Sequence, residues 1–315
     1  MGRAGKRELW LRQPRRGWLA WILYACSRCI VAVLLALPWG AGRAAAGFVG
    51  DLAYLFDSRE RHDEALANLQ RAFPGRGKAW SRKVLRGVYR HMAVSVVDSL
   101  HFVRRARRRD PAELFEVIGF EKLRAVGDGR GVIFVTGHFG HWEVLGAASA
   151  FLGYPVWSMG RRLRNVYLDA YVQKMRQSTG QRILDKDGGL RSIIRLLRRG
   201  ENVAILIDQD MRRDGIFVDF FGRPASTTAA PARLSMRTGA PVAFVYARLL
   251  PAQRRFRIVL KDVIPARTTG DSSANVRDVT QQLTSHLEEL VRQSPEEWLW
   301  LHRRWKTFPG KYGPA

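Results

Sequence analysis

The chain has 315 residues, near the upper limit for one hydrophobic core, so we expect one large domain or one domain with an appendage. Its hydrophobic fraction of 46% excludes an intrinsically disordered chain. The 53 basic against 28 acidic residues give a net charge of +25, which indicates an anionic partner: nucleic acid, an acidic protein, a phosphorylated substrate or a membrane surface. Two cysteines, Cys26 and Cys29, are too few for a disulfide scaffold or a four-thiolate metal site and favour a reducing compartment.

Residues 18–39 are apolar apart from Ser27 and Arg28, and twenty such residues in a helix reach about 30 Å, the thickness of a bilayer core. A cleaved signal peptide is disfavoured because the apolar run is too long. A simple span would place Arg28 deep in the bilayer, and residues 40–56 continue with small and apolar residues that suit a returning helix. We therefore expect a basic N-terminus and a monotopic or re-entrant anchor in residues 1–50, followed by a folded domain over residues 51–315. A helix buried in the protein core is the alternative.

Between residues 59 and 109, apolar side chains recur every three or four positions on both sides of Pro74 and Gly75, which predicts two helices joined by a turn. The second helix ends in the basic residues 104–109. They are either a solvated helix end or a contact with anionic lipid headgroups.

From residue 131 onward, short apolar runs alternate with helical patterns. The runs at 131–136, 202–207 and 241–246 predict buried central strands, and the run at 256–260 predicts another strand. Helices are expected at 142–152, 168–179, 190–199, 229–238 and 276–292. This order predicts an α/β fold with a mixed, mostly parallel sheet flanked by helices.

Ligands of such sheets bind beyond the carboxyl ends of the strands, where this chain places His138 after one strand, and Asp208 and Asp210 after another. Glu143 follows His138 by five residues, so its carboxylate can accept the imidazole Nδ1–H and leave Nε2 as a general base. No Gly-x-Ser-x-Gly turn precedes a helix, and both cysteines lie in the apolar run. The pattern therefore favours direct attack of a bound hydroxyl on an activated acyl group.

Other interpretations of these residues stay open. His138, His141 and Glu143 could bind zinc, although their spacing differs from His-Glu-x-x-His, and both histidines could be structural. Asp208 and Asp210 could be turn or capping residues. We expect no metal and no cofactor.

Several further motifs occur in order along the chain: Asn68-Leu69, Ala72-Phe73-Pro74, His138, Trp142-Glu143, Asp208-Gln209-Asp210, Phe220-Phe221-Gly222, Thr227-Thr228, Pro231-Ala232-Arg233-Leu234, Thr238-Gly239-Ala240-Pro241 and the closing Glu297-Trp298-Leu299-Trp300-Leu301-His302-Arg303-Arg304-Trp305-Lys306. In these motifs the chain resembles the late acyltransferases of lipid A biosynthesis, within the lysophospholipid acyltransferase superfamily. One departure is His141, where that family more often carries Asn.

The resemblance implies a catalytic domain in residues 51–315 that transfers an acyl chain from an acyl carrier protein or acyl coenzyme A to a hydroxyl of a phosphorylated glycolipid, most directly a lipid A precursor. It implies His138 as the base and Glu143 as its orienting residue. Arg176 would face a phosphate or the oxyanion, Asp208 and Asp210 would be acidic residues of the site, and Arg223 is a candidate phosphate contact. It also implies the cytoplasmic face of the inner membrane, whose anionic surface suits the basic chain.

Three alternatives remain. The acceptor could be another glycolipid or a lysophospholipid. The protein could be a noncatalytic membrane scaffold. It could bind nucleic acid, although the sequence has no zinc-finger spacing, RNP-type motif or basic zipper, and we therefore expect no nucleic-acid partner.

Overall fold

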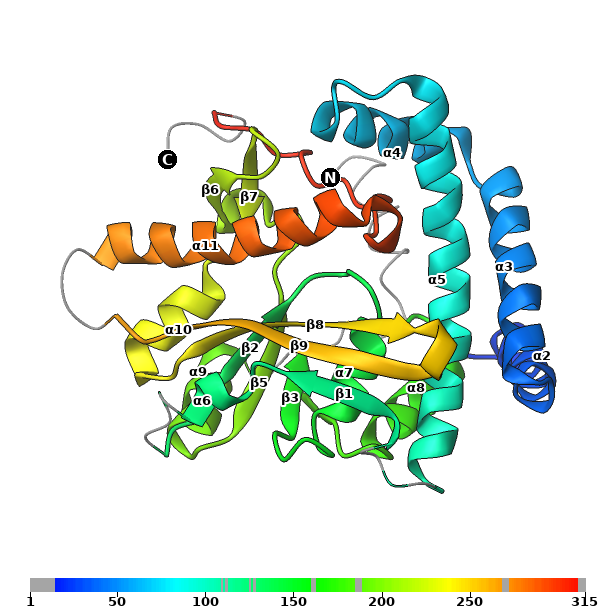
Figure 1. Ribbon diagram of the computed structural model, residues 1–315, viewed down its shortest axis with the longest axis horizontal. Helices are drawn as coiled ribbons and strands as arrows, with labels where there is room; N and C mark the ends of the chain where they lie inside the picture. Colours follow the sequence, from blue (N-terminus) through cyan, green and yellow to red (C-terminus); the bar gives the residue numbers. More distant parts are fainter. Residues whose placement is uncertain are drawn as a thin grey trace.

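The computed structural model describes residues 15–310 except 109, 111–112, 125, 127–128, 160–162, 185–188 and 268–271. The basic stretch before residue 15 and Arg109 thus lie outside the described residues. A seven-stranded sheet carries helices on its faces, and a group of helices stands at one end of it (Figure 1). This confirms the predicted α/β fold.

The sheet runs β1-β9-β8-β2-β5-β3-β4, and all neighbours are parallel except β8 and β9. All four residues of β2 are buried, as the unbroken apolar run predicted. The register pairs Thr136 of β2 with Leu206 of β5, so the residues that follow these two strands emerge side by side. The strands are β1 (Phe115–Ile118), β2 (Ile133–Thr136), β3 (Val156–Met159), β4 (Arg182–Leu184), β5 (Asn202–Leu206), β8 (Val242–Leu250) and β9 (Arg255–Ile264).

Helices cover both faces of the sheet, and α11 crosses above it beside a separate hairpin of β6 and β7 (Figure 1). Leu283, Leu287 and Leu290 of α11 belong to the same buried core as Ile133 and Val135 of β2. These elements are α6 (Glu121–Arg124), α7 (Trp142–Ala148), α8 (Val166–Gln177), α9 (Gly189–Arg198), β6 (Ile216–Asp219), β7 (Pro224–Thr227), α10 (Ala230–Thr238), α11 (Ser272–Gln293) and the 3-10 turns η3 (Arg212–Asp214), η4 (Pro251–Gln253) and η5 (Pro295–Glu297).

The N-terminal third of the chain contains α2 (Trp18–Ala36), α3 (Trp39–Phe56), α4 (Arg59–Ala72) and α5 (Lys78–Ala106). Pro38 ends α2 because the residue before a proline is pushed out of the helical region. Small buried residues of α3 lie against α5, and at Gly50 a Cβ would come within 2.7 Å of the Arg90 Cα. The two helices after residue 59 are confirmed, with the turn at Pro74 and Gly75.

The helix α2 is long and apolar enough to cross a membrane, and among the described residues it is the one such helix. Only 6% of its apolar stretch is buried, so the alternative of a buried core helix is wrong. It lies on α8, where Asn165 donates to the Ala20 carbonyl at 2.7 Å. Arg28 donates to the Tyr24 hydroxyl of α2, and its guanidinium lies 4.5 Å from the Tyr171 ring centroid of α8. Its charge is therefore stabilised by a hydrogen bond and a cation–π contact.

Candidate active site

His138 and Asp208 meet at the carboxyl edge of the sheet. Both follow their paired strands by two residues, and the Nδ1 atom of His138 lies 2.8 Å from Oδ1 of Asp208. Oδ2 of Asp208 accepts the backbone N–H of His138 at 2.6 Å and the indole N–H of Trp298 at 2.9 Å. With both Asp208 oxygens accepting, the network assigns the proton of neutral His138 to Nδ1 and leaves Nε2 as the basic atom.

The predicted contact between Glu143 and Nδ1 of His138 is not formed, and the prediction is wrong. Glu143 lies in the first turn of α7 and forms a two-pronged pair with Arg176 of α8, at 2.6 Å and 3.1 Å. Asp208 takes the Nδ1 position because β2 and β5 are adjacent, a pairing that sequence spacing does not give. Arg176 is thus near Glu143, and Asp208 has the contact expected of Glu143.

The electrostatics of the pair favour a basic imidazole. Burial would lower the pKa of His138, but the charge and hydrogen bond of Asp208, with the charge of Glu143, raise that pKa above its ordinary value. Burial would likewise raise the pKa of Asp208, whereas His138 holds it well below the usual range. Asp208 therefore stays ionised beside the imidazole.

Two aromatic side chains flank His138. The ring centroids of Trp142 and His302 lie 5.4 Å and 4.8 Å from that of His138, both at steep angles. Burial lowers the pKa of His302, which keeps this second imidazole neutral. The closing motif marked His302 and Trp298 in the sequence, but gave no reason to connect them with His138.

The segment that carries Trp298 and His302 is attached to the turn after β2 by main-chain hydrogen bonds. The Leu299 N–H donates to the His138 carbonyl at 3.1 Å, and the Gly140 N–H donates to the Glu297 carbonyl at 3.0 Å. The buried amide of Asn68 donates to the His302 carbonyl at 3.0 Å. Residues far apart in sequence thus fix the surroundings of His138.

Asp210 lies in a polar cluster with buried residues rather than in contact with His138. Its Oδ2 accepts the hydroxyl of Thr307 at 2.9 Å. Arg304, only 1% exposed, donates to the carbonyl of Ser226 and the hydroxyl of Thr227. Burial lowers the pKa of Arg304 to about 10, against the nearby charges of Asp208 and Asp210, so this guanidinium remains a cation.

Arg223 lies exposed in the β6–β7 turn, where its carbonyl accepts the N–H of Phe220 at 2.9 Å. The contacts of the described residues do not connect its side chain with His138, Glu143 or Asp208. Its expected role as a phosphate contact therefore stays a prediction.

The ring of His141 contacts Asp98 rather than a residue paired with His138. Its Nε2 lies 3.0 Å from a carboxylate oxygen of Asp98, while Glu143 binds Arg176. The three candidate zinc ligands therefore do not converge, and residues 15–310, apart from the gaps given above, contain no group of three or more His, Cys, Asp or Glu side chains suited to a metal.

An imidazole oriented by a buried carboxylate at the ligand-binding edge of an α/β sheet is an arrangement suited to general-base chemistry. The model of the family described as bacterial lipid A biosynthesis acyltransferase matches residues 6–307, and the chain belongs to this family of acyltransferases.

Curated relatives carry related names. The chain is 26% identical to the lipid A biosynthesis palmitoleoyltransferase of Escherichia coli, over 93% of each chain. It is 28% identical to the phosphatidylinositol mannoside acyltransferase of Mycolicibacterium smegmatis, over 61% of this chain and 63% of that one. The crystal structure of the 1-acyl-sn-glycerophosphate acyltransferase PlsC of Thermotoga maritima covers 79% of this chain and 97% of its own, at 16% identity and a TM-score of 0.38.

Proposed function

We propose that this protein is a membrane-associated O-acyltransferase. It moves a fatty acyl chain from an acyl thioester, carried by acyl carrier protein or coenzyme A, to a hydroxyl of a phosphorylated glycolipid, most directly a lipid A precursor. The observation that carries the proposal is the buried pair of His138 and Asp208, with Nδ1 and Oδ1 2.8 Å apart. The family and its named relatives support the glycolipid acceptor.

In this reaction Nε2 of His138 takes the proton of the acceptor hydroxyl as its oxygen attacks the thioester carbonyl. The C–S bond then breaks, and the imidazolium returns the proton to the leaving thiolate. Asp208 stabilises the imidazolium between these steps because its carboxylate is ionised and held by three N–H donors. The step needs no metal, because the base activates the hydroxyl and the thioester is already an activated acyl group.

Arg176 is the second group of the mechanism. Glu143 holds its Nε and Nη2, so the guanidinium has a fixed orientation while its other N–H groups stay available. A prepositioned donor of this kind stabilises an oxyanion or phosphate by about 3 kcal/mol. Glu143 therefore acts twice, as the residue that orients Arg176 and as a negative charge near His138.

The surfaces of α2 and α3 support membrane association. Large apolar side chains are exposed along both helices, among them Trp18, Ile30 and Phe56, the last 83% exposed. The contacts of α2 with α8 favour a helix lying along the domain at the membrane interface over one that leaves the domain to span the bilayer. We place the protein on the cytoplasmic face of the inner membrane, where anionic lipids attract Arg104, Arg107 and Arg108 at the end of α5.

The test is to incubate the purified protein with a lipid A precursor and either acyl carrier or coenzyme A thioester, and to detect the acylated product by mass spectrometry. His138→Ala should lose about 10²–10⁴-fold in rate, the usual contribution of a general base. His286→Gln is the matched control, because His286 pairs with Asp262 rather than with a residue of the proposed site, so this variant should keep its rate. If the lipid A precursor gains no acyl chain, the proposal is overturned. If only mannosides or lysophospholipids are acylated, the proposed acceptor is wrong and one of these takes its place.

Kinetics give a second test. Cys26 and Cys29 are exposed on α2 rather than placed beside His138, so we expect no covalent acyl-enzyme. Both substrates should therefore bind before either product leaves. An acylated enzyme trapped when the acceptor is withheld would contradict direct transfer. The basic chain should also make a carrier-protein donor more salt-sensitive than a coenzyme A donor.

A further inference from the structure

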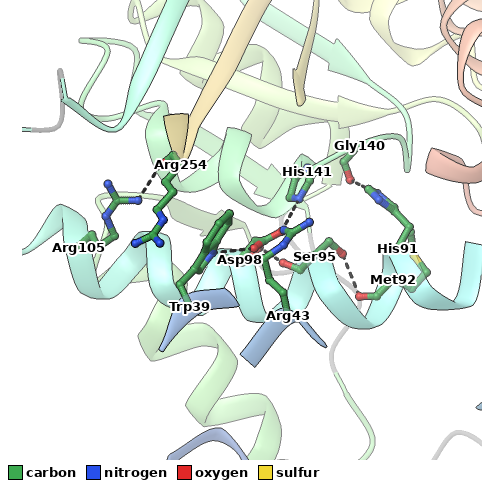
Figure 2. Close-up of polar contacts among 11 residues, drawn as sticks. Trp39, Arg43, His91, Met92, Ser95, Asp98, Arg105, Gly140, His141 and Arg254 are labelled. Atoms are coloured by element: carbon green, nitrogen blue, oxygen red, sulfur yellow. Dashed lines mark hydrogen bonds and ion pairs between the residues drawn. The ribbon is translucent and has the colours of Figure 1, made fainter. Parts of the chain in front are cut away.

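A second buried carboxylate, Asp98 of α5, lies outside the site described above and is only 1% exposed. Figure 2 shows three side chains directed at it. The indole N–H of Trp39 donates at 3.1 Å and the guanidinium of Arg43 forms an ion pair, both from α3, while Nε2 of His141 lies 3.0 Å away. One carboxylate therefore joins α3, α5 and the residue before α7.

The same helix also contacts the neighbouring position of this turn. The Nε2 atom of His91 lies 3.0 Å from the Gly140 carbonyl (Figure 2). Burial lowers the pKa of His91, which favours a neutral ring that donates this hydrogen bond. Gly140 and His141 stand between His138 and Glu143, so α5 holds the middle of the segment that carries the base.

His141 has no other polar side-chain contact in the described part of the chain, where its Nδ1 is buried without a partner. Its backbone N–H donates to the Ala247 carbonyl at 2.9 Å. The side chain of His141 is thus oriented by Asp98, which in turn depends on Arg43 and Trp39 for neutralisation of its buried charge.

We infer that Asp98 is a positioning residue. It holds the turn from His138 to Glu143 in place, and the position of that turn therefore depends on where α3 lies. The inference rests on the proposed function, in which α3 contacts the membrane. If α3 moves, Arg43 and Trp39 leave Asp98. The buried carboxylate then has His141 as its remaining side-chain partner among the residues that the structure describes, and it must bind His141 more tightly or change its position. The kcat of the enzyme then depends on the position of α3, whose outer side is exposed and apolar.

The chain offers a matched control for this inference. Asp51 also joins α3 to α5, through Arg86 at 2.7 Å and Arg90 at 2.6 Å, but at the exposed side of the helices. Asp51→Asn therefore removes two ion pairs from the same helix contact without touching the catalytic turn. We expect Asp98→Asn to lower kcat by about 10–100-fold with little change in the KM of the thioester, because small misplacements of a reacting group are costly. Asp51→Asn should stay within about twofold of the original kcat.

A double-mutant cycle tests the connection itself. Arg43→Gln and His141→Ala both act through Asp98, so their effects on kcat should not add, whereas Asp51→Asn and His141→Ala should add. His141→Asn keeps an N–H donor and should restore most of the rate lost in His141→Ala. Additive effects of Arg43→Gln and His141→Ala, or an Asp51→Asn loss equal to that of Asp98→Asn, would overturn the inference. This cycle also serves if Asp98→Asn does not fold.

Hydrogen exchange separates this inference from the proposed function. Arg43→Gln should speed amide exchange in residues 138–145 while Asp51→Asn should not, whatever reaction the protein performs. An unchanged segment in Arg43→Gln refutes the role of Asp98. Absence of product with the unmodified enzyme, together with faster exchange in Arg43→Gln, refutes the proposed function alone.

Discussion

Asp208→Asn is the most informative single change in the proposed site. Asparagine keeps the shape of the side chain, and its oxygen can still accept the N–H groups of His138 and Trp298. Its NH2 group then faces Nδ1 of His138, 2.8 Å away, and cannot accept a hydrogen bond from Nδ1–H. The imidazole is therefore driven to carry its proton on Nε2, where it can no longer act as a base.

The size of the effect follows from the two functions of the carboxylate. In triads where an aspartate orients a histidine, the change to asparagine costs about 10⁴ in kcat, and general-base catalysis as a whole supplies about 10²–10⁴. We expect a loss of about 10²–10⁴ in kcat, which is about 3–5 kcal/mol of transition-state stabilisation. The KM should change little, since Asp208 is completely buried.

The pH profile should also change, because the loss of Asp208 lowers the pKa of His138. The base works when neutral, so activity of the original enzyme falls as the pH drops through the pKa of His138, which Asp208 raises. Without this charge the pKa falls, and the acid limb of kcat/KM should move to lower pH while the plateau drops. Glu143 raises the same pKa by its charge alone, so Glu143→Gln should shift the limb less.

The assay is the initial rate of glycolipid acylation between about pH 5 and pH 9, with thermal unfolding of each variant as a control for folding. A nearly unaltered rate in Asp208→Asn, together with a large loss and a shifted limb in Glu143→Gln, would refute the assignment of Asp208 and return the orienting role to Glu143.

Four further outcomes are expected. Gly140→Ala should lower both the melting temperature and the rate, because φ is +57° and the new Cβ would stand 2.3 Å from the Ala247 carbonyl oxygen; calorimetry checks this, and an unchanged melting temperature would contradict it. Arg304→Met should cost about 1–3 kcal/mol of unfolding free energy in denaturant titrations, since the Ser226 carbonyl and the Thr227 hydroxyl each lose a buried hydrogen-bond donor. Deletion of residues 1–37 should reduce flotation with anionic vesicles, and full retention would refute the anchor. A chelator should leave the rate unchanged, and a loss restored by added zinc would revive a metal mechanism.

The main strands could be predicted because their apolar runs are long and continuous. Residues 202–207 and 241–246 fall on β5 and β8, and the helices expected at 190–199 and 229–238 lie within one residue of α9 and α10. The strands β1, β3 and β4 have only three or four residues each, with Glu116, Ser158 or Arg182 among them, so neither alternation nor an apolar run marks them. The β6–β7 hairpin was missed for the same reason.

The candidate site was predictable in part. His138 and Asp208 were found because both follow strands, but their contact depends on the adjacency of β2 and β5, which local patterns do not contain. The sequence placed Glu143 within reach of His138, whereas α8 supplies Arg176 as its partner instead. The partners of His141 come from helices that the sequence indicated only as membrane or amphipathic segments, so Asp98 carried no signal at all.

The hydrogen bonds around Asp208 have a consequence for the order in which the protein is made. Asp208 follows His138 by 70 residues, and Trp298 follows Asp208 by another 90. A ribosome adds about 5–20 residues per second, so the base is synthesised many seconds before the indole that completes the hydrogen bonding of its carboxylate. By then α2 has long emerged and can meet lipid. The hydrogen bonds of Asp208 are therefore complete only after the segment around Trp298 has been translated.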